Sequence, residues 1–174
     1  FPTIFKSKEW TKYFLCVIGD NILKKNNNLI HFMCPAFKVI LNSISNECSN
    51  YFSSSFNPTE SIKLKFHDHS YEKCRIIDIN DNITTKTYDE CINNIKGNIL
   101  DLISVSTYYS ERYGSSDNYI KTTLLNTEIY DRVFYLCITP IANQIKSFMC
   151  KYITNTNIKG KHITWDEVLF LWKY

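Results

Sequence analysis

The chain is 174 residues long, is 44% hydrophobic and carries a formal net charge of +3. This apolar content predicts a folded core rather than disorder, and the length favours a single domain over residues 1–174. The mild positive charge permits an acidic partner without requiring one. No apolar stretch approaches the roughly 20 residues of a membrane span, so we expect no membrane contact. The chain has only four glycines and four prolines, which disfavours barrels and sandwiches with many tight turns.

Neither end of the sequence has the features of a natural terminus. Phe1 stands in place of an initiator Met, and the last helical pattern stops at Tyr174 with no Gly, Pro or polar tail. Thr164 and Glu167 form a capping box at the start of that pattern, which predicts a helix that needs more chain. These features are typical of a segment of a longer protein, and the rest of that protein is an expected partner.

The first half of the chain begins with two amphipathic helical patterns. Ser7 is expected to cap a helix over about residues 8–25, and Pro35 favours the start of a second helix. A short apolar run at residues 29–33 separates the two patterns, and residues 53–58 are expected to form a loop. Both helices carry a continuous apolar face, which predicts that they pack on one core.

At Ile62 the spacing of apolar residues changes from a helical period of about 3.6 residues to a strand period of 2. Apolar and basic residues alternate from Ile62 to His67, and a second strand-like run covers residues 73–79. Because about six residues separate the two runs, they predict a β-hairpin over about residues 62–79.

The second half of the chain returns to helical patterns. Thr87 and Glu90 suggest a capping box for a helix that runs to about Tyr113, with Gly114 as its C-cap and Gly97 as a weak point inside it. Shorter helices are expected at residues 117–125 and 127–138, and a further helix opens at Pro140. The predicted fold class is therefore mainly α, a helical bundle-like domain with one small β-hairpin.

Seven cysteines occur, and their pattern is not that of a disulfide framework. The number is odd, no Cys-x-x-Cys pair is present, and most of them fall on apolar faces of the expected helices. Reduced, buried thiols in an intracellular protein are the expectation.

Several enzyme classes lack their signatures in this sequence. It contains no P-loop, no dinucleotide-binding glycine pattern, no Gly-x-Ser-x-Gly elbow and no His-Glu-x-x-His helix. With four glycines in the whole chain, a loop that cradles phosphates through backbone amides is difficult to build. We therefore expect no catalytic residues within this segment.

The expected hairpin contains one candidate metal site. His67, His69 and Cys74 could place two imidazoles and a thiolate around zinc, with Asp68, Cys91 or a water as the fourth ligand. A zinc-dependent enzyme is the function class that such a site would imply. The alternative is a polar hairpin tip whose Cys74 points into the core, since zinc ligands usually come as paired short spacings.

The same hairpin offers a candidate nucleic-acid surface. Alternation places Lys63 and Lys65 on one face of the first strand, and Lys73 and Arg75 on one face of the second. If these faces coincide, four positive charges gather where phosphates could bind. An ordinary solvated face is the alternative.

The stretch from Tyr108 to Tyr113 is rich in tyrosine and contains Arg112. Such rings could stack on the bases of a single strand. Alternatively, they pack at a helix end with their hydroxyl groups in water.

Seven strings of the sequence carry a resemblance, at residues 13–15, 19–25, 29–32, 66–77, 108–113, 162–165 and 170–173. Taken in order, they resemble a region of large proteins from giant DNA viruses of the mimivirus type, related to the poxvirus-like primase-helicases. The resemblance spans nearly all of the chain, but none of its strings is a catalytic motif, and the nucleotide-binding lysine of the family has no counterpart here.

The resemblance implies a role in DNA replication, inside a parent protein that could be an NTP-dependent helicase. We therefore expect a non-catalytic helical domain of a viral primase-helicase-like protein that contacts nucleic acid through the basic hairpin. The implied location is the host cytoplasm, a viral factory or the virion. The alternative is a viral structural or host-interaction protein, with exposed aromatic side chains as its anchors for another protein.

Overall fold

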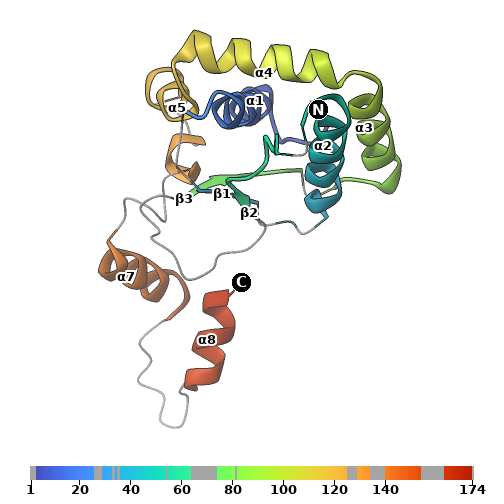
Figure 1. Cartoon of the computed structure of the whole chain (residues 1–174). Helices are drawn as coiled ribbons and strands as arrows, with labels where there is room; N and C mark the ends of the chain where they lie inside the picture. The colour runs from blue at the N-terminus through green and yellow to red at the C-terminus, as the bar shows by residue number, and fades with distance from the viewer. Residues whose placement is uncertain are drawn as a thin grey trace. The chain divides into compact units, whose positions relative to one another are not determined.

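A computed structural model of the chain describes residues 3–25, 29–32, 34, 36–53, 55–63, 74–80, 82–124, 129–133, 140–153 and 163–173 (Figure 1). The mainly helical fold class is confirmed. The chain forms two compact units, Phe1–Cys137 and Ile138–Tyr174, where the sequence predicts one domain. None of the helices in the described ranges is long and apolar enough to cross a membrane.

The first unit is built around α1, with α4 lying across it (Figure 1). The α3 helix stands at one end of α4 and α5 at the other, and α2 packs on α3 and α4. Residues 129–133 are also helical. The helices of this unit are α1 (Lys8–Ile22), α2 (Phe37–Tyr51), α3 (Thr85–Gly97), α4 (Ile99–Tyr113) and α5 (Ser116–Thr123).

The ends of these helices follow local side-chain chemistry. Ser7 caps α1 as predicted, because its hydroxyl accepts a hydrogen bond from the Trp10 amide at 3.3 Å. The predicted capping box at Thr87 is wrong. Thr84 is the N-cap of α3, and its hydroxyl accepts from the Thr87 amide at 3.2 Å. The sequence offers three threonines within four residues, and the earliest of them begins the helix.

The helix that the sequence predicts up to Tyr113 is two helices. It breaks at Asn98, directly after Gly97, and the chain turns there from α3 into α4. Gly114 ends α4 with a φ of 80°, a left-handed conformation that favours glycine, so the predicted C-cap is confirmed.

The strands form a three-stranded parallel sheet, so the predicted hairpin is wrong. The strands are β1 (Leu29–Phe32), β2 (Ile62–Lys63) and β3 (Cys74–Ile77), and their order is β2-β1-β3. Ile30 of β1 pairs with Ile62 on one side and with Arg75 on the other, both in parallel. The two predicted strands therefore exist but do not pair with each other. The short apolar run at residues 29–33 supplies the central strand between them.

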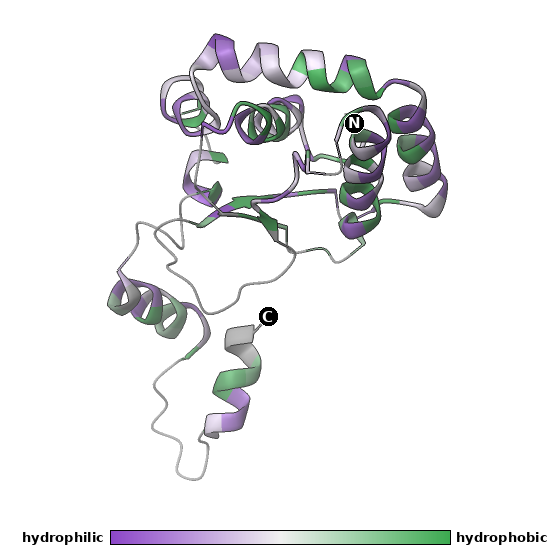
Figure 2. Ribbon diagram, in the orientation of Figure 1, coloured by the Kyte–Doolittle hydropathy of each residue, from purple (hydrophilic) through white to green (hydrophobic). Residues whose placement is uncertain are grey.

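The core of the first unit lies between the sheet and α1. Most of the strand residues are hydrophobic (Figure 2). Four buried phenylalanines meet there, and the rings of Phe32 and Phe37 stack with centroids 4.1 Å apart. The Phe14 ring packs edge-on against both, which is a preferred geometry for aromatic pairs. Phe5 completes the group against Phe14 and Phe37. These contacts fasten β1, α1 and α2 into one body.

Gly19 allows α1 and α4 to approach each other closely. A Cβ atom at this position would lie 2.1 Å from the backbone oxygen of Ser106 and 2.7 Å from the Cβ of Ser110. Real side chains do not tolerate such distances, so any larger residue would separate the helices. Because Ser110 and Asp20 lie at the same crossing, this approach also sets the polar contacts described below.

The second unit contains α7 (Ile141–Tyr152) and α8 (Trp165–Lys173). The predicted capping box at the start of α8 is confirmed. The Thr164 amide donates to Glu167 Oε2 at 2.8 Å, and the Glu167 amide donates to Thr164 Oγ1 at 3.3 Å.

Candidate nucleic-acid interface

The four basic residues predicted to bind phosphate are described by the structure to different extents. Lys63 forms the end of β2, and its side chain lies outside the described residues, as do Lys65 and Lys73. Arg75 is the only one of the four whose side chain is described, and it is 8% exposed. The sheet order also separates β2 from β3 by a whole strand. Arg75 is therefore not part of an exposed basic face.

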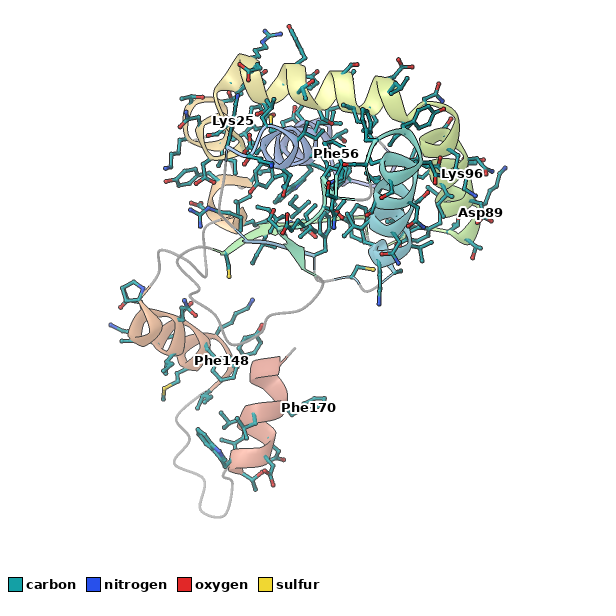
Figure 3. All side chains as sticks on the ribbon, in the orientation of Figure 1. Lys25, Phe56, Asp89, Lys96, Phe148 and Phe170 are labelled. Carbon is teal, nitrogen blue, oxygen red and sulfur yellow. The ribbon has the colours of Figure 1, made fainter. Side chains whose placement is uncertain are left out.

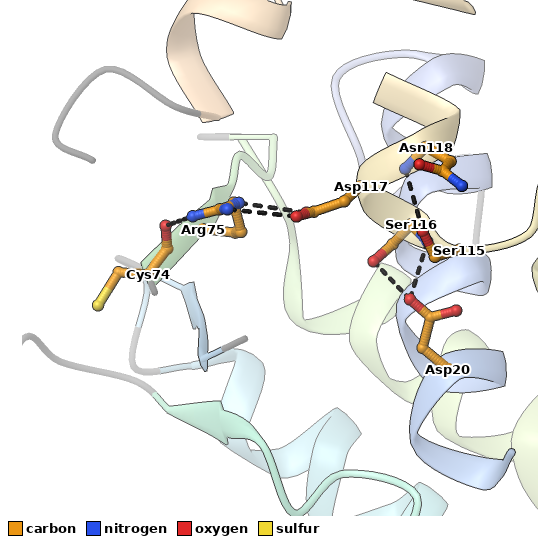
Figure 4. A network of polar contacts seen from close by, with 7 residues as sticks. All are labelled: Asp20, Cys74, Arg75, Ser115, Ser116, Asp117 and Asn118. Carbon is orange, nitrogen blue, oxygen red and sulfur yellow. Dashed lines mark hydrogen bonds and ion pairs between the residues drawn. The ribbon is translucent and has the colours of Figure 1, made fainter. Parts of the chain in front are cut away.

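Arg75 instead holds β3 to α5 (Figure 4). Its Nε and Nη2 atoms each donate to one carboxylate oxygen of Asp117 at 3.2 Å, and its Nη1 donates to the backbone oxygen of Cys74 at 2.8 Å. This two-pronged geometry is specific to arginine and carboxylate. The alternation of the sequence identifies a charged residue here but not the partner that buries it.

The predicted metal ligands are only partly described. His67 and His69 lie outside the described residues, and Cys74 is fully buried at the start of β3. Within the described ranges, no group of three or more His, Cys, Asp or Glu side chains is placed to hold a metal ion. The burial of Cys74 agrees with the alternative interpretation, in which this thiol points into the core.

A buried carboxylate joins α1, α4 and α5. Asp20 on α1 is 1% exposed and accepts a hydrogen bond from the Ser110 hydroxyl at 2.7 Å. Ser116, the first residue of α5, donates to it from both its backbone nitrogen and its hydroxyl, at 2.8 and 2.6 Å (Figure 4). A buried charge is costly unless it is fully hydrogen-bonded, and this one is. The contacts fix the last turn of α4 against the ends of the neighbouring helices.

That last turn of α4 presents the tyrosine–arginine cluster, which we define as Tyr108, Tyr109, Arg112 and Tyr113. Tyr108 is 55% exposed, and its hydroxyl accepts a hydrogen bond from Arg112 Nη1 at 3.1 Å. The Arg112 guanidinium lies 6.0 Å from the centre of the Tyr108 ring and 5.6 Å from that of Tyr113. The contact with Tyr108 raises the pKa of Arg112, so this side chain stays cationic.

A series of ring contacts connects the tyrosines of the cluster to the core. Tyr109 and Tyr113 are parallel within 2°, with centroids 6.1 Å apart, as the spacing of four residues on a helix allows. Tyr113 also packs edge-on against the buried Tyr119 of α5 at 4.7 Å. The outer rings are thus held in position by a buried one. One end of the cluster packs, as the alternative interpretation predicts, and the other faces solvent. Stacking on the bases of a single strand stays a prediction.

The end of α1 brings two lysines to this region. Lys25 N donates to Asp20 O at 2.9 Å and Lys24 N donates to Asn21 O at 3.3 Å, which is the pattern of a Schellman motif. Lys24 adopts a φ of 52° at a position that usually holds glycine. The Lys25 ammonium lies 2.7 Å from Glu111, so it sits beside the cluster (Figure 3).

The buried thiols of the first unit are not activated nucleophiles. Burial raises the pKa of Cys16 to about 12, with a contribution from the nearby Asp20 carboxylate. Burial also raises the pKa of Cys48 to about 11 and that of Cys91 above its ordinary value. A thiol attacks as its thiolate, so these three groups stay inert at neutral pH. The six described cysteines are free, which agrees with the expectation of reduced thiols.

The second unit presents a different surface. Ile145, Met149 and Tyr152 are exposed along one face of α7, at the spacing of successive helical turns. Lys146 and Lys151 are exposed on the same helix. Residues 138–174 contain five lysines and two acidic residues, which equals the +3 of the whole chain. The first unit is therefore formally neutral, and the net positive charge resides in the second.

No protein-family model, curated protein or solved structure matches the chain significantly.

Proposed function

We propose that this chain is a non-catalytic binding module of a larger viral DNA-replication protein, and that it contacts single-stranded nucleic acid through the tyrosine–arginine cluster. The observation that carries the proposal is the pair of Tyr108 and Arg112, which lie in contact with each other on the exposed end of α4. The role in replication rests on the resemblance described above, and the contact surface rests on the geometry of the cluster.

Single strands are bound without base readout when aromatic rings stack on bases and cations attract the backbone. The cluster offers both groups on one helical turn, because residues 108 and 112 lie on the same side of α4. The arginine plane can also stack on a base, and a guanidinium pairs well with phosphate. Tyr113 and the buried Tyr119 support the outer rings, so little side-chain freedom remains to be lost on binding.

The charges of the first unit favour stacking over long-range attraction. This unit is formally neutral, and the cluster has Lys25 as a basic neighbour, which pairs with Glu111. Lys63, Lys65 and Lys73 stay a prediction, since their side chains lie outside the described residues. We therefore expect moderate affinity and a modest salt dependence.

The zinc-enzyme alternative depends on His67 and His69, and elemental analysis of the purified chain decides it. Stoichiometric zinc would favour a metal site at these histidines. The binding proposal does not require a metal.

The test is fluorescence anisotropy of the full chain with a labelled oligothymidine of about 20 nucleotides, a length that spans one or more typical binding sites. Tyr108→Ala should weaken binding about tenfold, the loss expected for one stacked base. Arg112→Ala should weaken it as well and should reduce the slope of log affinity against log salt by about 0.7.

Matched controls exist on the same unit. Tyr51 of α2 is 58% exposed, close to the 55% of Tyr108, and Lys96 of α3 lies at the opposite end of the unit from Lys25 (Figure 3). Tyr51→Ala and Lys96→Ala should leave the affinity unchanged. Equal losses in the controls, or no binding even at low salt, would contradict the proposal and would favour a protein partner instead.

A further inference from the structure

The exposed face of α7 combines apolar side chains with lysines at its edges. Ile145, Met149 and Tyr152 are 44, 49 and 50% exposed, and their spacing of four and three residues places them on one side of the helix. Lys146 directly follows the first of these residues, and Lys151 directly precedes the last. Since successive residues turn by about 100° around a helix, the two lysines lie on opposite edges of the apolar face.

The positive charge of this face is not balanced within α7. The helix contains no aspartate or glutamate, and neither Lys146 nor Lys151 forms an ion pair with another side chain of the described ranges. The Lys151 ammonium lies 5.2 Å from the centre of the Tyr152 ring, so it stays beside the apolar face. Charge complementarity therefore selects a partner with an apolar face and a negative edge.

The other helix of the second unit has these properties. Trp165 and Leu169 are four residues apart on α8 and are 72% and 37% exposed. Asp166 follows Trp165 directly and is exposed beside this face. The first turn of α8 contains Asp166 and Glu167, so negative charge is concentrated at the start of the helix.

Neither helix face is covered within a single chain, because the apolar side chains of both faces remain exposed. Helices as short as α7 and α8, with 12 and 9 residues, are marginal in water unless they pack on another element. Both helices therefore need a partner.

We propose that α7 packs on α8 of a second copy of the chain, with Lys146 and Lys151 beside Asp166 of that copy. A two-fold axis makes the contact twice, so each copy supplies one α7 and one α8 and all four faces are covered. An anionic lipid surface fits less well, since lipid-binding segments usually carry about four to eight basic residues and α7 has two. The contact is independent of the proposed nucleic-acid surface, because the two share no residue.

The test is sedimentation equilibrium of the full chain over a range of concentrations, which should show a dimer. Ile145→Asp should raise the dissociation constant of the dimer at least about tenfold, because it places a charge at the centre of a contact that occurs twice. Val39→Asp is the matched control, since Val39 is 55% exposed on α2 of the first unit, and it should leave the dimer unchanged.

Charge reversal identifies the two faces. The double variant Lys146→Glu, Lys151→Glu and the single variant Asp166→Lys should each dimerise more weakly than the parent, because like charges then meet in both contacts. An equimolar mixture of the two variants should dimerise about as well as the parent, since opposite charges meet in both contacts of the mixed dimer. A loss caused by misfolding of either variant would not recover on mixing.

A chain that stays monomeric at every concentration would overturn the proposal, as would a dimer that Ile145→Asp does not weaken or a mixture that shows no recovery. Binding of the monomeric chain to vesicles of anionic lipid would also overturn it and would assign the face of α7 to a membrane surface.

Discussion

Ser116 donates two hydrogen bonds to a single carboxylate oxygen of Asp20, one from its backbone nitrogen and one from its hydroxyl. The two residues are 96 positions apart in the sequence and join the end of α1 to the start of α5. Ser110 of α4 occupies the other oxygen. The position of the tyrosine–arginine cluster therefore depends on one buried aspartate.

Replacing that aspartate should destabilise the first unit. Asp20→Ala leaves three buried donors without an acceptor, and we expect the free energy of unfolding to fall by about 3 kcal/mol, since each orphaned donor is costly. Urea denaturation followed by circular dichroism measures the change. Asp89→Asn on the exposed side of α3 is the control and should change it by less than about 0.5 kcal/mol. Equal stability of the two variants would show that the three hydrogen bonds do not support the fold.

Replacement of Gly19 and Gly97 by alanine should change the stability of the protein in opposite directions. Gly19→Ala places a Cβ against the backbone of Ser106 and should destabilise the protein by about 1–3 kcal/mol. Gly97→Ala meets no atom within 4 Å and should be neutral or stabilising by up to about 1 kcal/mol, because alanine favours the helix. Thermal melts of both variants compare them directly. If Gly19→Ala melts as the parent does, the close approach of α1 and α4 is contradicted.

The pair of Arg75 and Asp117 should contribute to stability and not to nucleic-acid affinity. Arg75→Met removes the guanidinium from the Asp117 carboxylate in a largely buried site, and we expect the free energy of unfolding to fall by about 3 kcal/mol. Adding Asp117→Asn should recover part of that loss. The affinity for the oligothymidine, measured below the melting transition, should stay unchanged. A fall in affinity at unchanged stability would instead indicate that Arg75 contacts the nucleic acid.

The cysteine thiols should differ in reactivity according to their burial. Cys150 is exposed and should react quickly with a disulfide reagent at neutral pH, whereas Cys16 and Cys48 should react only after unfolding.

Folding raises the pKa of Cys16 from 9.0 to about 12, so the folded chain holds this proton more tightly than the unfolded chain. Stability from this group is therefore complete below pH 9.0 and is lost as the pH rises towards about 12. Melting temperatures that rise over this interval would contradict the assignment.

The sequence predicts helices well where a cap or a glycine marks the end. Ser7, Gly114 and the pair of Thr164 and Glu167 all act as expected, because a cap is a contact between residues that are close in the chain. The helix predicted from Thr87 begins three residues earlier, since neighbouring threonines compete for the role of N-cap. It also breaks at Asn98, directly after the weak point that Gly97 marks in the sequence.

Strand pairing is not a local property, and the sequence does not determine it here. The alternation after Ile62 indicates a strand but contains no information on which segment will pair with it. The central strand β1 is a four-residue run, Leu29–Phe32, which is too short for its pattern to distinguish a strand from a helical segment. Because β1 lies between β2 and β3, Arg75 is separated from the strand that carries Lys63, and its burial removes it from the expected basic face.

The hydrogen bonds around Asp20 could not be predicted from the sequence either. Asp20 belongs to an otherwise apolar helical stretch, and a charged residue in such a place is the one signal that could have suggested a buried partner. Its partners lie on α4 and α5, which only the tertiary structure brings together. The tyrosine–arginine cluster, by contrast, follows from i, i+4 spacing within one helix.

The most direct test of the proposed function is photo-crosslinking of the full chain to an oligonucleotide that contains iodouracil, followed by peptide mapping. Iodouracil crosslinks to aromatic rings that stack on it, so the site of modification reports the contact itself. We predict crosslinks to Tyr108 or its neighbours Tyr109 and Tyr113, and their loss in Tyr108→Ala. Crosslinks confined to other segments, with the peptide of residues 108–113 unmodified, would contradict a nucleic-acid contact at the end of α4.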